Sequence, residues 1–330
     1  MSKLFSLPVE LLQLIGDHLE SQSDINIFIR TCKHLHSVLN GYLYRYNSIN
    51  HRRSALFWAA ERDIPETAAH SIKAAPYTEI RNMAGMTPLI IAVQKGHLST
   101  VKQLLEYVDR GINLEERNDD RRTPLAFAAC FGQAETAKLL IEKGANIESK
   151  DEGQKTPLIL AAVNGYPDVV KLLLDHGAAV HEKDEYGRTA LAWAADIGKL
   201  VAVDHLLENG ALVDARTIND STPLMIAAAN GRDTVVKRLL EGGADPNARS
   251  GNGWTVLHYA ANFDPKESVV RQLLAAGSDP KATISSARYP NRTPADVAYR
   301  YPHNRPESEV VYNILLEAAG GGQSDDAGSR

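Results

Sequence analysis

The stretch Thr222-Pro-Leu-Met-Ile-Ala-Ala-Ala-Asn-Gly231 decides the fold, because it carries both the start and the stop signal of a short helix. The hydroxyl of Thr222 is suited to accept a hydrogen bond from a free backbone N–H of the first helical turn. Pro223 follows at the first helical position, where its missing N–H costs nothing. Gly231 predicts an end to the helix in the left-handed conformation. Three apolar residues recur at helical spacing and share one face: Leu224, Ala227 and Ala228.

The next residues predict a second helix, so that the two form a short helical hairpin. Asp233 is expected to cap this helix and Gly243 to end it. Its apolar face is predicted to consist of Val236, Leu239 and Leu240. One such hairpin is too small to bury its apolar face, so it needs a copy of itself as a neighbour.

Copies of the unit recur along the chain at a nearly constant period. Measured from one capping position to the next, the steps are 33, 36, 33, 33, 33, 33 and 38 residues. Two insertions account for the longer steps, one within 107–113 and one within 283–291. The units start near residues 54, 87, 123, 156, 189, 222, 255 and 293.

This pattern of T-P-L-x-x-A at a period of 33 residues resembles the ankyrin-repeat family over residues 54–319. The resemblance implies an all-α ankyrin-repeat solenoid of about eight helix-turn-helix units with short hairpin loops. The tail 320–330 is rich in Gly, Ser and Asp, and we expect it to be disordered.

Composition excludes several classes of protein. The formal net charge of −5 argues against a general nucleic-acid binder, which needs clustered positive charge. The chain has two cysteines, which provide no disulfide framework and suit a reducing compartment. No apolar run is long enough to span a membrane, and no signal peptide precedes Glu10. We therefore expect a cytoplasmic or nuclear protein that does not bind membranes.

Residues 1–46 do not follow the repeat. They predict three short helices with more apolar surface than they bury among themselves, and 47–53 is a short linker. The run Leu7-Pro8-x-Glu10-Leu11-Leu12-x-x-Ile15, followed by Thr31-Cys32-Lys33-x-Leu35, resembles an F-box. The segment departs from that family in its short polar linker before Asp24 and in lacking the usual Trp near its end.

An F-box at this place, as in fungal-type F-box/ankyrin proteins, implies docking on a Skp1-like adaptor. The residues that the resemblance assigns to this contact are Leu7, Pro8, Leu11, Leu12, Ile15, Ile25 and Phe28. The alternative is that residues 1–46 are a helical cap covering the end of the solenoid. The two interpretations are compatible with each other.

Reactive side chains form no recognisable catalytic, cofactor or metal site. Cys32 and His36 share a helix face but supply two ligands where a structural zinc site takes four. His258 follows Thr-Val-Leu, where ankyrin repeats often carry His, and we interpret it as a structural hydrogen-bonding residue. The sequence thus predicts no enzyme, no cofactor and no metal.

The resemblance places the function on the hairpin tips and on the inner helix face. Side chains of Tyr, Trp, Phe and Arg at those positions are the types that contribute most to interface energies. The residues expected to hold a substrate protein are Arg122, Phe131, Tyr186, Arg188, Asn230, Trp254 and Phe263.

The two resemblances together predict a non-enzymatic adaptor, monomeric before assembly. Its F-box would dock the adaptor of a Skp1–cullin–F-box type ubiquitin ligase while the ankyrin array holds the substrate. The alternative is a ligase-independent scaffold or transcriptional coregulator in which residues 1–46 are only a cap.

Overall fold

The computed structural model describes residues 55–74, 81–108, 112–285, 290–299 and 306–320. Segment 1–46, linker 47–53 and the seven residues expected to contact a Skp1-like adaptor lie outside these ranges, as does the tail after Gly320. The expectations for those segments therefore stay predictions.

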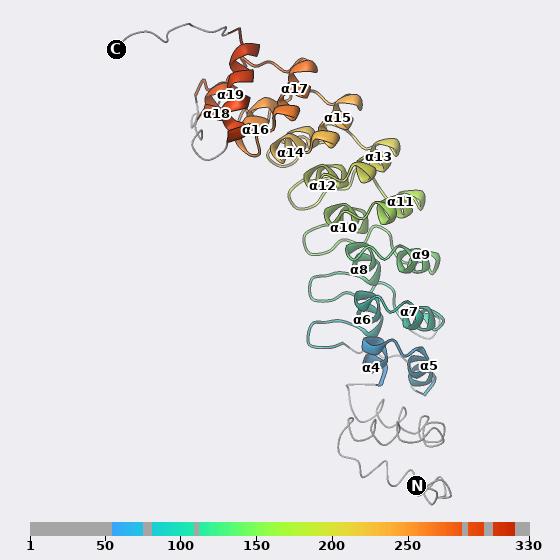
Figure 1. Cartoon of the computed structure of the whole chain (residues 1–330). Coiled ribbons are helices and arrows are strands. Elements are labelled where there is room, and N and C mark those ends of the chain that lie inside the picture. The colour runs from blue at the N-terminus through green and yellow to red at the C-terminus, as the bar shows by residue number, and fades with distance from the viewer. Residues whose placement is uncertain (1–54, 75–80, 109–111, 286–289, 300–305, 321–330) are drawn as a thin grey trace, which may run out of the picture. The chain divides into compact units, whose positions relative to one another are not determined.

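The described residues form sixteen α-helices in eight consecutive pairs, and they contain no β-strand (Figure 1). An isolated β-bridge joins Arg249 to Thr255. The expectation of an all-α chain is confirmed. The pairs are α4 (Ala55–Arg62) with α5 (Pro65–Ala74), α6 (Pro88–Lys95) with α7 (Leu98–Leu105), α8 (Pro124–Cys130) with α9 (Ala134–Glu142), α10 (Pro157–Asn164) with α11 (Pro167–Asp175), α12 (Ala190–Ile197) with α13 (Leu200–Glu208), α14 (Pro223–Ala229) with α15 (Asp233–Glu241), α16 (Val256–Asn262) with α17 (Glu267–Ala275), and α18 (Pro294–Tyr299) with α19 (Pro306–Ala318).

The described chain divides into two compact units. Unit 1 comprises the described residues up to Ala128 together with Glu135–Ser149, and unit 2 comprises Ala129–Ala134 and the described residues from Lys150 onward. In unit 1, α4 packs on α6 and α5 packs on α7. In unit 2, the first helices of the pairs pack in the order α10, α12, α14, α16 and α18, and the second helices follow in parallel from α11 to α19.

The unit that starts at Thr222 shows why each pair forms. The Thr222 hydroxyl accepts from the Met225 N–H at 3.4 Å, and Pro223 opens the helix. Gly231 follows the helix with φ 58°, in the left-handed region. The predicted apolar face of α14 is buried completely, because each of its residues is 0% exposed: Leu224, Ala227 and Ala228.

The second helix of this unit departs from the prediction at its start. Asp233 is the first residue of α15 and not its cap, since Arg232 takes the cap position without a side-chain hydrogen bond. The physical reason is the turn at Gly231, after which the Arg232 N–H already donates to the Ala227 carbonyl at 2.9 Å. The chain thereby enters the helix one residue earlier. Gly243 follows the C-cap residue Gly242 with φ +87° and ends the helix as predicted. Of the predicted apolar face, Val236 and Leu239 are buried, whereas Leu240 is half-buried and Val235 is buried in addition.

Each pair from α6/α7 to α16/α17 is preceded by a hairpin of constant design. The first residue of the hairpin donates its N–H to the carbonyl of the fifth, as from Asp184 to Arg188 at 3.0 Å. In unit 2, successive hairpins are also joined by main-chain hydrogen bonds. These run from Glu185 to Gly153 at 3.1 Å, from Ile218 to Tyr186 at 3.1 Å and from Gly251 to Asn219 at 3.0 Å.

Candidate protein-binding surface

Two apolar side chains stand exposed at neighbouring hairpin tips of unit 2. Tyr186 is 50% exposed and Ile218 is 66% exposed. The Ile218 N–H donates to the Tyr186 carbonyl, so the two tips are held next to each other by the main chain. The two side chains therefore form an apolar surface that is already in place and that a partner protein could cover.

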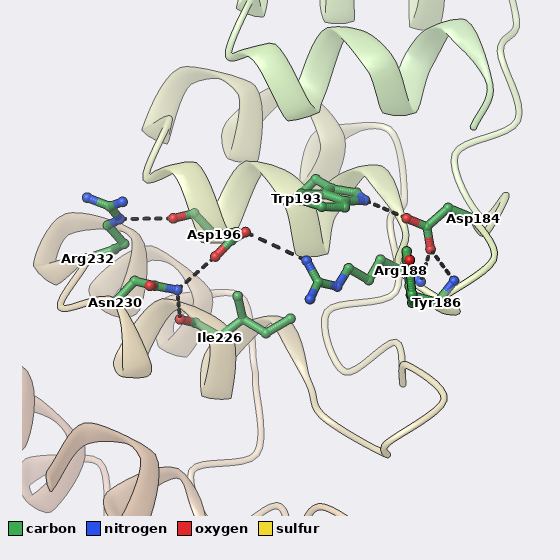
Figure 2. Close-up of polar contacts among 8 residues, drawn as sticks. All are labelled: Asp184, Tyr186, Arg188, Trp193, Asp196, Ile226, Asn230 and Arg232. Atoms are coloured by element: carbon green, nitrogen blue, oxygen red, sulfur yellow. Dashed lines mark hydrogen bonds and ion pairs between the residues drawn. The ribbon is translucent and has the colours of Figure 1, made fainter. Parts of the chain in front are cut away.

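Close to these two side chains, the guanidinium of Arg188 lies over the indole ring of Trp193 in α12. Its guanidinium carbon is 4.4 Å from the centroid of the indole ring, within the range of a cation–π contact. The Trp193 Nε1–H donates to Asp184 Oδ2 at 2.9 Å, and Asp184 Oδ1 accepts the N–H groups of Tyr186 and Arg188 (Figure 2). Asp184 is buried, so one carboxylate fixes both the hairpin and the indole against which Arg188 stacks.

The C-terminal end of α12 carries the polar part of the surface. Asp196 Oδ2 lies 3.7 Å from an Arg188 nitrogen, and its Oδ1 accepts from the Asn230 amide at 2.8 Å. Asn230 also donates to the Ile226 carbonyl at 2.9 Å, and the Arg232 Nε–H donates to the Asp196 carbonyl at 3.0 Å (Figure 2). The contacts link two adjacent helix pairs and hold the side chains in place before any partner arrives.

We call the surface formed by Tyr186, Arg188, Trp193, Ile218 and Asn230 the hairpin face. Three of these residues, Tyr186, Arg188 and Asn230, are among those that the sequence predicts for substrate binding, and the structure brings the three together. Trp193 and Ile218 are not among the residues predicted from the sequence. Alignment of the repeats gives a signal for Trp193. The fourth residue after each capping Thr of unit 2 is apolar or aromatic, and these residues are Leu160, Trp193, Ile226, Tyr259 and Val297.

The other four predicted residues have different surroundings. Trp254 and Phe263 form an aromatic cluster with Tyr259, with ring centroids 5.6 to 6.2 Å apart. The Tyr259 hydroxyl lies 3.2 Å from the Ser221 hydroxyl, which ties the cluster to the preceding hairpin. Phe131 is 45% exposed directly after α8. Arg122 belongs to unit 1, where its backbone N–H donates to Asn118 Oδ1.

His258 has the structural role that its sequence position suggests. It is completely buried, and its Nε2 lies 3.0 Å from the Arg292 carbonyl oxygen, which only accepts. Nε2 therefore carries the proton, and Nδ1 accepts from the Thr255 N–H and hydroxyl at 3.2 and 2.8 Å. Burial lowers the pKa of His258 to about 4, an effect that outweighs the opposing hydrogen bond to Arg292. The lone pair is thus occupied and the ring neutral.

Within the described ranges, no three His, Cys, Asp or Glu side chains gather in a way that could hold a metal ion. Cys32 and His36 lie outside those ranges. No described helix combines the length and the apolar character that crossing a bilayer requires.

Comparison with known proteins agrees with this architecture. The family model described as Ankyrin repeats (3 copies) matches residues 56–151, 144–217 and 198–284. Among solved structures, the crystal structure of the human ASB11 ankyrin repeat domain is 27% identical with a TM-score of 0.60, covering 71% of this chain and 98% of that one. No curated protein sequence matches the chain. Because the family model spans well over half of the sequence, the chain belongs to the ankyrin-repeat family.

Proposed function

We propose that the chain is a non-enzymatic adaptor that holds a partner protein on the hairpin face of unit 2. The ankyrin-repeat fold is generally a protein-interaction scaffold without catalytic function, and it implies protein partners. The observation that carries the proposal is the pairing of Tyr186 and Ile218 at adjacent tips, beside an arginine already stacked on Trp193. Exposed aromatic and arginine side chains with fixed rotamers are the usual anchors of protein interfaces.

Affinity capture from a cell lysate with the tagged full-length chain, followed by mass spectrometry, tests this function. The variant is Tyr186→Ala combined with Arg188→Ala. The matched control is Val201→Ala, which removes an exposed apolar side chain from α13 instead. We expect the double variant to bind the specific partner at least about tenfold more weakly than the unmodified chain does. The control should bind the partner with unchanged affinity. Equal capture by both variants would contradict the proposal.

The finer part of the proposal concerns residues 4–46, which resemble an F-box. Together with the partner-binding array, this segment would make the chain the substrate-recognition subunit of a Skp1–cullin–F-box type ubiquitin ligase, acting in the cytoplasm or nucleus. The array would raise the effective concentration of the substrate near the ligase. Only the sequence resemblance supports this part.

Co-purification with a Skp1-type adaptor tests the F-box independently of the hairpin face. The variant Leu7→Asp, Pro8→Ala, Leu11→Asp should lose the adaptor but keep the partner of unit 2. If the variant is folded and binds as much adaptor as the unmodified chain, the F-box proposal is wrong. The ligase-independent scaffold then gains support, especially if deletion of residues 1–46 mainly lowers the melting temperature, as expected for a solenoid cap.

A further inference from the structure

A basic residue stands six positions before each capping Thr of the central units. In unit 2 these residues are Lys150, Lys183, Arg216 and Arg249, which we call the basic row. From Lys183 onward, each side chain reaches the main chain of the following unit. Lys183 Nζ donates to the Arg216 carbonyl at 2.8 Å, Arg216 Nη1 to the Arg249 carbonyl at 2.8 Å, and Arg249 Nη1 to the Thr283 carbonyl at 2.9 Å.

Both arginines of the row are held by a single nitrogen. Nη1 of Arg216 also donates to the Asp220 carbonyl at 3.2 Å, and Nη1 of Arg249 donates to the Gly253 carbonyl at 3.0 Å. The edge formed by Nε and Nη2 makes no hydrogen bond within the described part of the chain. Such an edge is the donor pair that binds a carboxylate through two parallel hydrogen bonds. The main-chain anchors orient the guanidinium beforehand and so reduce the entropy cost of binding.

The same arrangement already holds a carboxylate elsewhere in this chain. Arg81 occupies the equivalent position in unit 1, and its Nη1 donates to the carbonyls of Gly85 and Arg117. Its Nη2 pairs with Glu116 Oε2 at 2.9 Å. Likewise, Lys150 of the basic row pairs with Glu182 Oε2 at 2.7 Å. Each of these carboxylates comes from the residue immediately before the next basic residue.

The other three members of the row lack this carboxylate, because the corresponding position is an alanine. The alanines are Ala215 after Lys183, Ala248 after Arg216 and Ala282 after Arg249. Over the described ranges, no carboxylate forms an ion pair with Lys183, Arg216 or Arg249, and all three residues are exposed. Three successive cations are therefore anchored but not neutralised.

We propose that Lys183, Arg216 and Arg249 form a docking strip for an extended acidic segment of the partner protein, which supplies the three missing carboxylates. The inference rests on the proposed protein-binding function and adds the chemistry of the segment that is bound. The expected anions are Asp and Glu side chains, since Glu116 pairs with Arg81 and Glu182 pairs with Lys150 at the equivalent positions of other repeats. Nucleic acid is disfavoured by the net charge of −5.

Spacing within the fold sets the spacing of the acidic residues. The first helices α12, α14 and α16 pack side by side (Figure 1), and packed helices lie about 8–10 Å apart. A polyproline II segment has three residues per turn and rises about 3.1 Å per residue, so every third side chain returns to one side after about 9 Å. We therefore expect an acidic residue at every third position of the bound segment.

The direct test uses fluorescently labelled synthetic peptides and the full-length chain. The probe contains three consecutive Glu-Pro-Pro triplets. One control peptide has Gln in place of each Glu, and another has the same composition with the three glutamates adjacent. We expect the spaced acidic probe to bind most tightly, with an affinity that falls as salt is added because exposed ion pairs are screened. Equal binding of the spaced and adjacent peptides would overturn the spacing, and equal binding of the Gln peptide would overturn the docking strip.

Two variants separate the strip from general folding effects. In the first, Ala215→Glu with Ala248→Glu supplies internal carboxylates as Glu182 and Glu116 do, and leaves all cations in place. In the second, Lys183→Gln removes one cation and keeps the rest. The control for the first variant is Thr234→Glu, which adds a negative charge on the exposed surface of α15, away from the basic row.

We expect the double glutamate variant to weaken probe binding about tenfold and Lys183→Gln to weaken it a few-fold, as exposed ion pairs usually do. Thr234→Glu should leave probe binding unchanged, and melting curves check that each variant is folded. Unchanged binding in both test variants would refute the docking strip. The hairpin-face variants of Tyr186 and Arg188 test the proposed function separately. If these variants lose the captured partner while the strip variants bind it as the unmodified chain does, the docking strip is wrong and the proposed function stands.

Discussion

At the scale of single residues, hydroxyl and glycine signals in the sequence translate directly into backbone geometry. Thr87, Thr156, Thr189 and Thr222 each accept a hydrogen bond from the N–H three residues later, at 3.3 to 3.4 Å. These contacts are local, so the sequence alone was sufficient to predict them. Removing one of these capping hydrogen bonds should lower the free energy of unfolding by an amount that can be measured for each repeat.

Thr222→Ala should lower the free energy of unfolding by about 1 kcal/mol, because the first turn of α14 loses its cap while Thr222 is fully buried. The control is Thr234→Ala at an exposed position of α15, where we expect a change below about 0.5 kcal/mol. Chemical denaturation of both variants provides the comparison. Equal effects of the two substitutions would mean that the cap contributes nothing of its own.

His258 predicts a pH dependence of stability. Its pKa is about 4 in the folded chain and near 6.5 when unfolded, so between these values the unfolded chain binds a proton that the folded chain does not. The contribution of this residue to stability is complete above pH 6.5 and is lost as the pH falls toward 4. Between pH 7 and pH 5 the loss should be about 2 kcal/mol.

The matched variant is His258→Met, because Met225 occupies the same place in the preceding unit and its sulfur lies 3.5 Å from the Thr222 N–H. Denaturation at pH 7 and pH 5 should show that the free energy of unfolding falls by about 2 kcal/mol less in the variant than in the unmodified chain. An unchanged drop would show that other groups cause the dependence.

At the scale of elements, the hairpins depend on close approach between neighbours. Gly187 has φ +69°, and a β-carbon placed there would lie 2.9 Å from the Ile218 nitrogen. Gly210 has φ +82° and no atom within 4 Å of such a β-carbon. Both glycines accommodate a left-handed backbone, but only Gly187 also makes room for the next hairpin.

Gly210→Ala should therefore cost about 1 kcal/mol from backbone strain alone. Gly187→Ala should cost about 2–4 kcal/mol, because the clash with Ile218 adds to the same strain. Thermal and chemical unfolding of the pair distinguish the two effects. If the costs are equal, the approach of the two hairpins is not a constraint.

Element boundaries were predictable from the sequence where they depend on local signals, and the side-chain network was not. The period of 33 residues and the Gly stops identified the helix pairs. Asp233 was assigned as a cap because its residue type favours that position, but the turn at Gly231 starts the helix before it. The contact of Trp193 with Asp184 joins a helix to its hairpin, and the bond between Asn230 and Asp196 joins two adjacent helix pairs. Tertiary packing decides these contacts, and no local pattern encodes them.

At the scale of the whole molecule, each helix pair is stabilised mainly by its neighbours in the same unit. The α13 helix packs on α11, α12 and α15, and its Leu206 is fully buried. In repeat proteins, such nearest-neighbour contacts supply most of the stability. Damage in one pair is therefore expected to spread to adjacent pairs first.

Leu206→Ala should lower the free energy of unfolding by about 2–5 kcal/mol, as expected for a cavity in a packed core. Hydrogen exchange should show the largest loss of protection in α12 to α15 and a smaller loss in α18 and α19. The control is Leu212→Ala, whose side chain is 62% exposed and whose loss should change little. A uniform loss of protection across all the helices of unit 2 would indicate that this unit unfolds in one step.

The main-chain hydrogen bonds between hairpins determine which substitutions the hairpin tips tolerate. The donors are the amides of residues 185, 218 and 251, so the join does not depend on which side chains stand there. A combinatorial library at these positions should keep its register through almost any replacement. Proline is the exception, because an imino acid has no hydrogen to give. At these three positions, proline is thus the one residue that the main-chain bond excludes, and selection or engineering can otherwise change the side chains to alter specificity.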